Sequence, residues 1–212
     1  ALKDDMVYTF IAKSLDKAGN YSSVYSTYTV TYDTTGPNVS LAFPKDGEAY
    51  STIKVSTPAA GTTSNTQSSP DTGVSTVTVA ITDLKDSKCF DGTSFVACSA
   101  PVWLPINAGT VADWKYSDPD IAFAGDHNYK FEARAADIAK NYSAVKSVII
   151  KYDIDRPTSS ITGPPADPDY VKKLDKISGT ASDDPGNNKD YEAKLGTYTL
   201  KTALKLRYGG WW

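Results

Sequence analysis

The sequence predicts an all-β protein built from antiparallel β-sandwich domains in tandem. Three observations predict this class: a composition rich in Tyr, Thr, Ser and Val, short stretches of alternating apolar and polar residues, and an internal repeat. The 212 residues include 14 Tyr, 14 Gly and 12 Pro, which favours half-buried strands joined by turns. The chain is 40% hydrophobic and 22% charged, as in an ordinary folded protein.

The internal repeat predicts where the domains begin and end. Residues 8–22 align without gaps with residues 129–143, with eight identities in fifteen positions. Two further pairs of segments resemble one another, namely 39–50 with 159–170 and 61–64 with 179–182. We therefore expect the C-terminal strands of one domain in residues 1–36, a complete domain in residues 37–156, and the N-terminal strands of a further, truncated domain in residues 157–212.

The middle domain shows the alternation of half-buried strands. Apolar side chains share a face in three stretches: Val39, Leu41 and Phe43; Val77, Val79 and Ile81; and Tyr129, Phe131, Ala133 and Ala135. Residues 147–152 are expected to form the closing strand. Several short strands with turns between them predict two antiparallel sheets packed face to face. A barrel is the alternative.

Two motifs carry a resemblance to a known family. Asp16–Asn20 (DKAGN) precedes a final strand and Tyr32–Pro37 (YDTTGP) opens the next unit, and both motifs return at residues 137–141 and 152–157. With the ISGTASDD segment at residues 177–184, the chain resembles the bacterial Ig-like repeat domains of large repetitive surface and secreted proteins. The resemblance implies Ig-like sandwiches in tandem at an extracellular or cell-surface location, and no particular activity. The second copy departs from the pattern, because Lys140 stands where the first copy has Gly19.

Charge and hydropathy exclude several partners. The net charge is −3 and no cluster of Lys and Arg is present, so we expect no nucleic-acid partner and no attraction to an anionic membrane. No apolar run approaches the ~20 residues that span a bilayer, so we expect no membrane insertion by this segment. Because the chain does not begin with Met and shows no signal peptide, we expect a mature or proteolysed fragment.

The two cysteines, Cys89 and Cys98, flank an Asp-Gly turn signal. A hairpin would place them opposite each other, where a disulfide is feasible and suits an oxidising compartment. Two reduced thiols are the alternative. A zinc site needs more ligands than these cysteines and the lone His127 supply.

Acidic residues recur at the turns and linkers. One interpretation is structural, since Asp and Asn side chains accept hydrogen bonds from nearby backbone N–H groups and stabilise turns. The other is Ca²⁺ binding between successive domains, with oxygen ligands drawn from Asp16, Asp33, Asp137, Asp153 and Asp155. The chain has no Ca²⁺-loop motif, so the second interpretation rests on composition.

No catalytic motif is found, and we expect no enzyme activity and no required cofactor. His127 is predicted in a turn, without a nucleophile motif such as GxSxG. The paired carboxylates at residues 4–5, 118/120 and 183–184 are expected to be solvated turn residues.

Aromatic residues offer the one competing binding hypothesis. Trp103, Trp114 and Tyr116 form a sugar-stacking platform in one interpretation and fill the core in the other. The first interpretation also includes Trp211 and Trp212. The terminal Gly-Gly-Trp-Trp resembles the start of the hairpin at residues 89–95, and on that reading we expect the two tryptophans to mark a truncation.

We expect a non-catalytic structural repeat, such as a stalk, sheath or filament-forming segment, whose partners are neighbouring repeats or subunits. A carbohydrate- or surface-binding adhesin module, with glycans or a host surface as partner, is the first alternative, and an accessory domain of a secreted hydrolase is the second. Residues 157–212 of one chain and 1–36 of the next could complete one sandwich, but they total roughly 30 residues too few, which favours a fragment. Glycosylation sequons occur at Asn20, Asn38 and Asn141.

Overall fold

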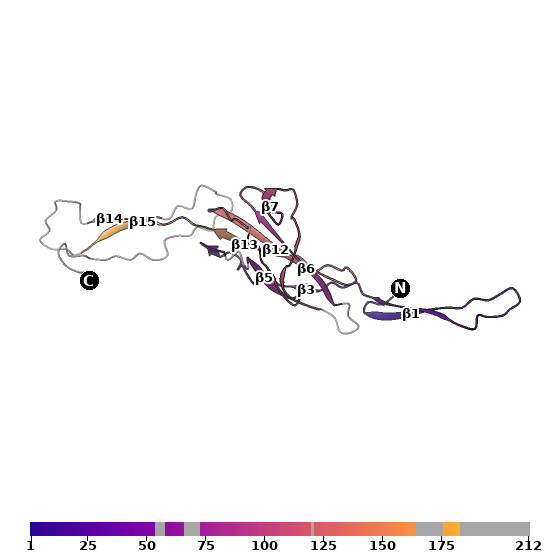
Figure 1. The fold of residues 1–212 in the computed structure, drawn as a ribbon. Coiled ribbons are helices and arrows are strands. Elements are labelled where there is room, and N and C mark those ends of the chain that lie inside the picture. Colours follow the sequence, from indigo (N-terminus) through magenta and orange to yellow (C-terminus); the bar gives the residue numbers. More distant parts are fainter. Residues whose placement is uncertain (54–57, 66–72, 120, 164–175, 183–212) are drawn as a thin grey trace.

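The computed structural model describes residues 1–53, 58–65, 73–119, 121–163 and 176–182. Every regular element in these ranges is a β-strand. The strands form three groups along an elongated molecule (Figure 1): the β1–β2 hairpin, a central pair of sheets and the paired strands β14 and β15. We call residues 1–36, 37–156 and 157–212 the first, middle and third units.

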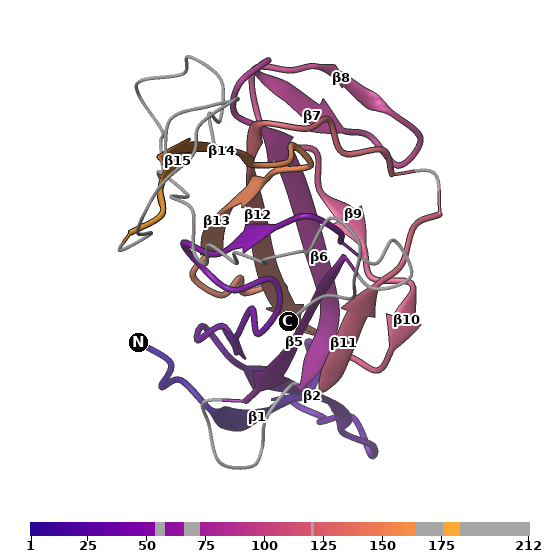
Figure 2. The same ribbon diagram turned by 90° about the vertical axis from the view of Figure 1, so that its left-hand side faces the viewer.

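The middle unit consists of two sheets. One has the order β10-β11-β5-β3, and the other has the order β4-β13-β12-β6-β7-β8, with β9 also paired to β6. Figure 2 shows β5 and β11 side by side in one sheet, and β12 and β6 in the other. The bounds are β3 Asn38–Val39, β4 Ala49–Tyr50, β5 Ala59–Ser64, β6 Val74–Asp83, β7 Lys88–Phe90, β8 Phe95–Ala97, β9 Leu104–Pro105, β10 Ala108–Gly109, β11 Asp113–Tyr116, β12 His127–Asp137 and β13 Lys146–Tyr152.

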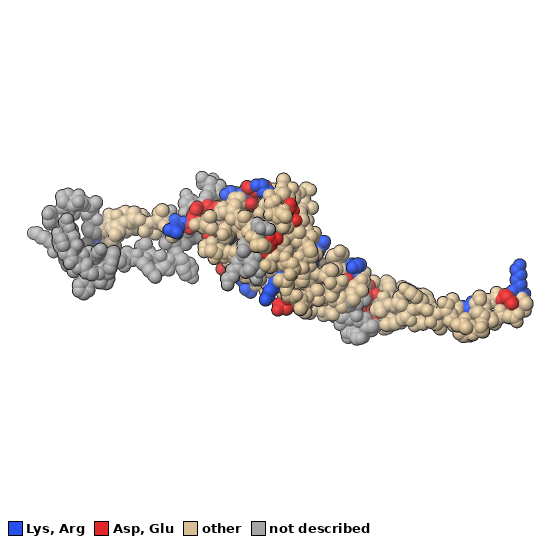
Figure 3. Space-filling view, viewed as in Figure 1, with Lys and Arg blue, Asp and Glu red and all other residues tan. Residues whose placement is uncertain are grey.

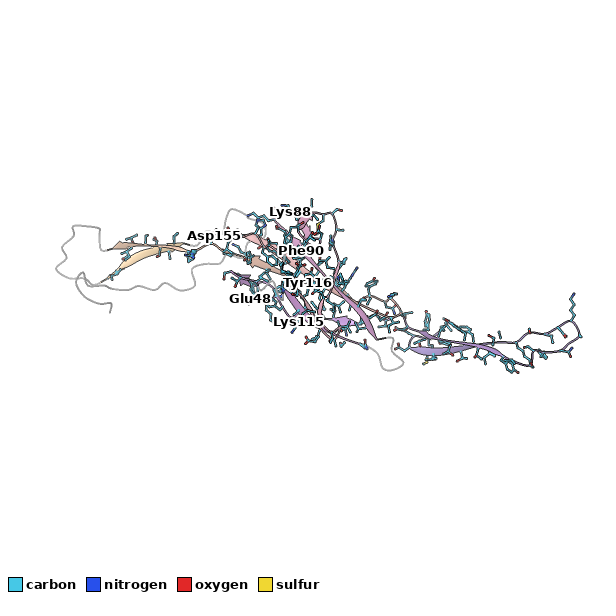
Figure 4. The ribbon with its side chains drawn as sticks, viewed as in Figure 1. Glu48, Lys88, Phe90, Lys115, Tyr116 and Asp155 are labelled. Atoms are coloured by element: carbon cyan, nitrogen blue, oxygen red, sulfur yellow. A yellow bond between two sulfur atoms is a disulfide. The ribbon has the colours of Figure 1, made fainter. Side chains whose placement is uncertain are left out.

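The core lies between the two sheets, which excludes the barrel. The alternation predicted for β6 is confirmed, since Val77, Val79 and Ile81 are all buried. From the facing sheet, Trp114 and Tyr116 enter the same core cluster, and Figure 4 shows Tyr116 and Phe90 within this part of the molecule. Each large apolar side chain buried in this way contributes about 1.5–3 kcal/mol.

The segment after β3 crosses from one sheet to the other. Phe43 still pairs with Ala60 of β5, and a cis Phe43–Pro44 peptide follows. The Ile149 N–H then donates to Asp46 Oδ1 at 2.8 Å, and β4 runs parallel to β13. Both sheets are thereby tied to the same short stretch of chain.

The first unit repeats the last hairpin of the middle unit. Its strands, β1 (Met6–Ala12) and β2 (Ser26–Tyr32), pair antiparallel, as β12 and β13 do. The Tyr8 hydroxyl accepts from the Lys3 N–H at 2.6 Å, five residues upstream, and the Tyr129 hydroxyl accepts from the Ala124 N–H at 2.7 Å over the same spacing.

The third unit repeats the first hydrogen-bonded strands of the middle unit. Its described strands are β14 (Thr158–Gly163) and β15 (Ser178–Ser182). The hydroxyls of Ser160 and Thr180 lie 2.8 Å apart. In the middle unit, the hydroxyls of Ser40, just after β3, and Thr62 of β5 lie the same distance apart. The sequence repeat is therefore also a repeat of hydrogen bonds.

Candidate functional site

The best-defined polar site joins the first unit to the middle unit. The linker after β2 lies against the turn that follows β12. The Asn141 side-chain amide donates to the Asp33 carbonyl oxygen at 3.0 Å and to Asp33 Oδ1 at 3.4 Å. The same amide nitrogen donates to Asp137 Oδ2 at 2.9 Å. One side chain therefore holds its own turn and the incoming linker together, and we call this contact the joint.

Close packing of backbone on backbone completes the joint. A Cβ added to Gly36 would overlap with the carbonyl group of Tyr142. Pro37, the next residue, is buried. Only glycine permits this approach of the two main chains. The linker sequence Gly36-Pro37 therefore allows the linker to pack directly against this turn.

On its other side, the linker is bound by the first unit. Asp4 accepts hydrogen bonds from the Thr34 N–H at 2.6 Å and from the Thr35 hydroxyl at 2.7 Å. The Thr35 hydroxyl bond is the main reason that the pKa of Asp4 falls below its ordinary value. From the sequence, Asp4 was expected to be a solvated turn residue; its role at the linker is not visible there, because Thr34 lies thirty residues away.

The five acids proposed as calcium ligands lie in three places, and the structure brings two of them, Asp33 and Asp137, to the same Asn141 amide. Asp33 comes within 4.8 Å of Asp4 and Asp5, measured between carboxylate oxygens. Asp137 bonds to Asn141, and Asp16 bonds to Asn20 in the first unit. Calcium binding therefore stays a prediction, and its candidate ligands at the joint are the Asp4–Asp5–Asp33 group.

The remaining two acids lie at the end of the middle unit. Asp153 Oδ1 accepts from the Asp155 N–H at 3.0 Å, and Asp153 Oδ2 lies 3.8 Å from the Lys151 ammonium. Burial, followed by the carboxyl of Asp155, raises the pKa of Asp126. A lysine therefore partly neutralises this acid cluster, whereas Thr31 stands at the corresponding position of the first unit.

The predicted disulfide is present. Cys89 lies in β7 and Cys98 directly follows β8, with Cα atoms 5.7 Å apart. The two cysteines are diagonal rather than directly opposite, because Cys89 pairs with Val96 in the ladder. A loop of this size should stabilise the fold by about 2–3 kcal/mol, and the bond ties the outermost strand of the larger sheet to its neighbour.

The aromatic residues proposed as a sugar platform lie elsewhere. Trp114 is 0% exposed and Tyr116 is 3% exposed, so both belong to the core. Trp103 packs under the Arg134 guanidinium, 4.1 Å from the ring centroid. These three side chains thus form no shared surface for stacking, while Trp211 and Trp212 lie outside the described residues.

A buried histidine–aspartate pair was missed by the sequence analysis. His127 was predicted in a turn, but it begins β12, is 9% exposed, and its Nδ1 lies 2.7 Å from Asp83 Oδ2. Alternation was the available signal, since Asp83 continues the inward face of Ile81 and His127 that of Tyr129. Asp86 also comes within 4.8 Å of this pair, but it is exposed and bonds to Lys88 at 2.9 Å.

The three sequons differ in what a glycan would disturb. Asn20 and Asn38 are exposed. The Asn141 amide nitrogen, to which a glycan would be attached, already donates to Asp33 and Asp137. Modification at Asn141 would therefore compete with the joint.

Comparison with protein-family models gives no match, and comparison with curated proteins gives none either. Among the described residues, no helix is long and apolar enough to cross a bilayer.

Proposed function

We propose that this chain is a non-catalytic, extracellular structural segment made of Ig-like domains in tandem, serving as a stalk, sheath or filament-forming part of a large surface protein. The observation that carries the proposal is the joint. A linker held on both sides, by Asp4 of the first unit and Asn141 of the middle unit, fixes the direction of one unit relative to the next.

The order of the strands supports the Ig-like assignment. β3, β5, β11 and β10 correspond to strands A, B, E and D of an immunoglobulin sandwich, and β13, β12 and β6 correspond to G, F and C. The Tyr129 hydroxyl bonds to the backbone of Ala124, upstream of strand F, as in a tyrosine corner. The strand pairs on either side of the middle unit, β1 with β2 and β14 with β15, repeat pairs of the middle unit and support the tandem arrangement.

The short linker supports a stiff array. Only five residues, 33–37, separate β2 from β3, and Pro37 restricts its own backbone and that of Gly36. Each hydrogen bond of the joint contributes about 1 kcal/mol net. Several such bonds with the buried proline are enough to favour one orientation over a freely hinged linker.

The Cys89–Cys98 disulfide supports an oxidising, non-cytoplasmic location. A sugar-binding module would need accessible aromatic rings, and two of its three candidates are in the core. The structural role is therefore the better-supported proposal.

The test is the distance distribution between spin labels on the first and middle units. Labels at Val24→Cys and Lys115→Cys, both exposed positions, should give one narrow distribution by pulsed electron resonance. Gly36→Val should broaden it, because the added side chain cannot occupy the space beside Tyr142. Asn38→Ala, an exposed residue just after the linker, is the matched control and should leave the width unchanged.

A broad distribution in the unaltered linker would overturn the stiff-array proposal. So would a Gly36→Val variant as narrow as the parent.

A further inference from the structure

The first unit carries a second copy of the turn that forms the joint. In the middle unit, the Asn141 N–H donates to Asp137 Oδ1 at 2.8 Å and its amide to Oδ2 at 2.9 Å. In the first unit, the Asn20 N–H donates to Asp16 Oδ1 at 2.8 Å and its amide to Oδ2 at 3.0 Å. Backbone bonds close both turns, between residues 16 and 20 and between residues 137 and 141.

The two turns agree even where their sequences differ. Gly19 has φ +90° and Lys140, at the matching position, has φ +75°. Beyond each turn, a cation lies over a tyrosine ring. The Lys13 ammonium lies 3.9 Å from the Tyr21 ring centroid, and the Arg134 guanidinium lies 4.9 Å from the Tyr142 ring centroid. The two copies thus present the same main-chain and ring surface.

They differ in what lies on that surface. An asparagine amide has two N–H donors, and Asn141 uses them on Asp137 and on the Asp33 carbonyl of the linker. Within the described part of the chain, Asn20 has only Asp16 as an acceptor for its amide. Burial follows the same division, because Asp137 is 3% exposed whereas Asp16 and Asn20 are exposed.

We propose that the Asp16–Asn20 turn is a docking site for the linker of another repeat of this type, an extended segment of the pattern Asp-x-x-Gly-Pro. This inference rests on the proposed tandem array, and it names the segment that binds the exposed end of the first unit. The Asn20 amide donates its second hydrogen to the carbonyl of the linker's Asp, and the linker glycine lies against the Tyr21 carbonyl. The turn occupies the end of the hairpin away from the joint, so docking there continues the array in line (Figure 1).

The geometry also assigns a specificity. Because a Cβ at Gly36 would overlap with the Tyr142 carbonyl, the residue before the proline must be glycine for this seat. The chain's other linker has Arg156 at that position. A linker of the Asp33–Pro37 type should therefore bind the turn better than one of the Asp153–Pro157 type.

The experiment is an NMR titration of the full chain with the peptide TYDTTGPNVS, which copies residues 31–40. We expect saturable shifts at the Asn20 side-chain amide and at Tyr21, with a dissociation constant of about 1 mM or below. Asn141 and Tyr142 should not shift, since their own linker already occupies them.

Two changes test the contacts. The peptide TYDTTRPNVS should bind at least about tenfold more weakly, and this comparison leaves the protein unaltered. Asn20→Ala should abolish the shifts at Tyr21, while Val24→Ala, in the same loop, should preserve them.

Several results would overturn the docking site. They are the absence of shifts in residues 13–22 at several millimolar peptide, equal binding of the glycine and arginine peptides, and unchanged binding to Asn20→Ala. If these occur while the spin-label distribution at the joint stays narrow, only the docking site fails and the proposed function stands.

Sedimentation velocity of the full chain identifies the source of the linker. Association with rising concentration that Asn20→Ala abolishes would assign the linker to a second copy of this chain. A monomer that binds the peptide would assign it to a different repeat.

Discussion

Single side chains decide how the units of this protein are joined. Asn141 bridges Asp137 and the linker residue Asp33, and Asp4 holds the same linker from the first unit. None of these residues belongs to a large apolar cluster. The joint is therefore polar, and its strength should depend on the ionisation of its carboxylates.

The Asp4 carboxylate predicts how the joint responds to acid. Hydrogen bonds from Thr35 and Thr34 lower its pKa below the ordinary 3.8. A carboxyl whose pKa is depressed in the folded state stabilises that state above its unfolded pKa, and this contribution is lost as the pH falls through the lower, folded pKa. The Thr34 amide signal should therefore titrate with a midpoint below 3.8 in a series of NMR spectra.

Asp4→Asn should remove that transition and leave the spectrum of the middle unit unchanged. A midpoint at or above 3.8 for Thr34 would contradict the assigned hydrogen bonds.

Strands of the same sequence pattern have different surroundings in the three units. Phe131 of β12 is 1% exposed, whereas Phe10, its counterpart in β1, is 54% exposed. The two sheets of the middle unit cover the first residue, and no described strand covers the second. In the smaller sheet, the absence of a side chain at Gly61 lets both Ser40, which follows β3, and the Trp114 ring approach the backbone of β5. The same approach recurs in the third unit, where a Cβ on Gly179 would lie 2.5 Å from the Ser160 carbonyl oxygen.

Gly61→Ala should therefore destabilise the middle unit. The new methyl group would overlap with the Ser40 carbonyl oxygen and lie 2.6 Å from Trp114 Cζ2. Overpacking of this kind costs about 1–3 kcal/mol, which urea denaturation followed by Trp fluorescence would measure. Ser64→Ala, at the exposed end of the same strand, should change the free energy of unfolding by less than about 0.5 kcal/mol.

The whole molecule is a chain of units with one dense centre. Figure 3 shows acidic and basic side chains mingled over the middle unit and few charges along the first. The strands of the first hairpin, β1 and β2, contain no charged residue, so no charged side chain within these strands discourages pairing of their edges with another strand. Stability should accordingly be concentrated in residues 37–156.

Limited trypsin digestion would measure this uneven stability. Cleavage should occur first at the exposed Lys13 and Lys17 of the first unit. Arg134 and Lys130 lie within β12 at the centre of the larger sheet, and cutting there requires the middle unit to open, so we expect rates at least about tenfold lower. Comparable early cleavage at Arg134 would show that the middle unit is not the stable part of the molecule.

Much of the fold could be predicted from alternation and turn chemistry. The inward faces of β6 and β12, the all-β class and the Cys89–Cys98 bond all follow from local pattern. Local pattern placed His127 in a turn, because the surrounding GDHNY segment has turn-like residues. In the structure His127 is the first residue of β12, because it pairs with β13, which is distant in the sequence. Local pattern also grouped the linker acids by composition, whereas long-range contacts place Asp33 beside Asp4 and Asp5.

Periodicity and repetition within the chain were thus sufficient for the strands, the repeat and the turns at Asp16 and Asp137, because each depends on residues a few positions apart. The folded arrangement alone decided which copy of the turn holds a linker and which aromatic rings are buried. Those outcomes depend on contacts between residues far apart in sequence, such as Asp33 with Asn141, and no local pattern encodes such a distance.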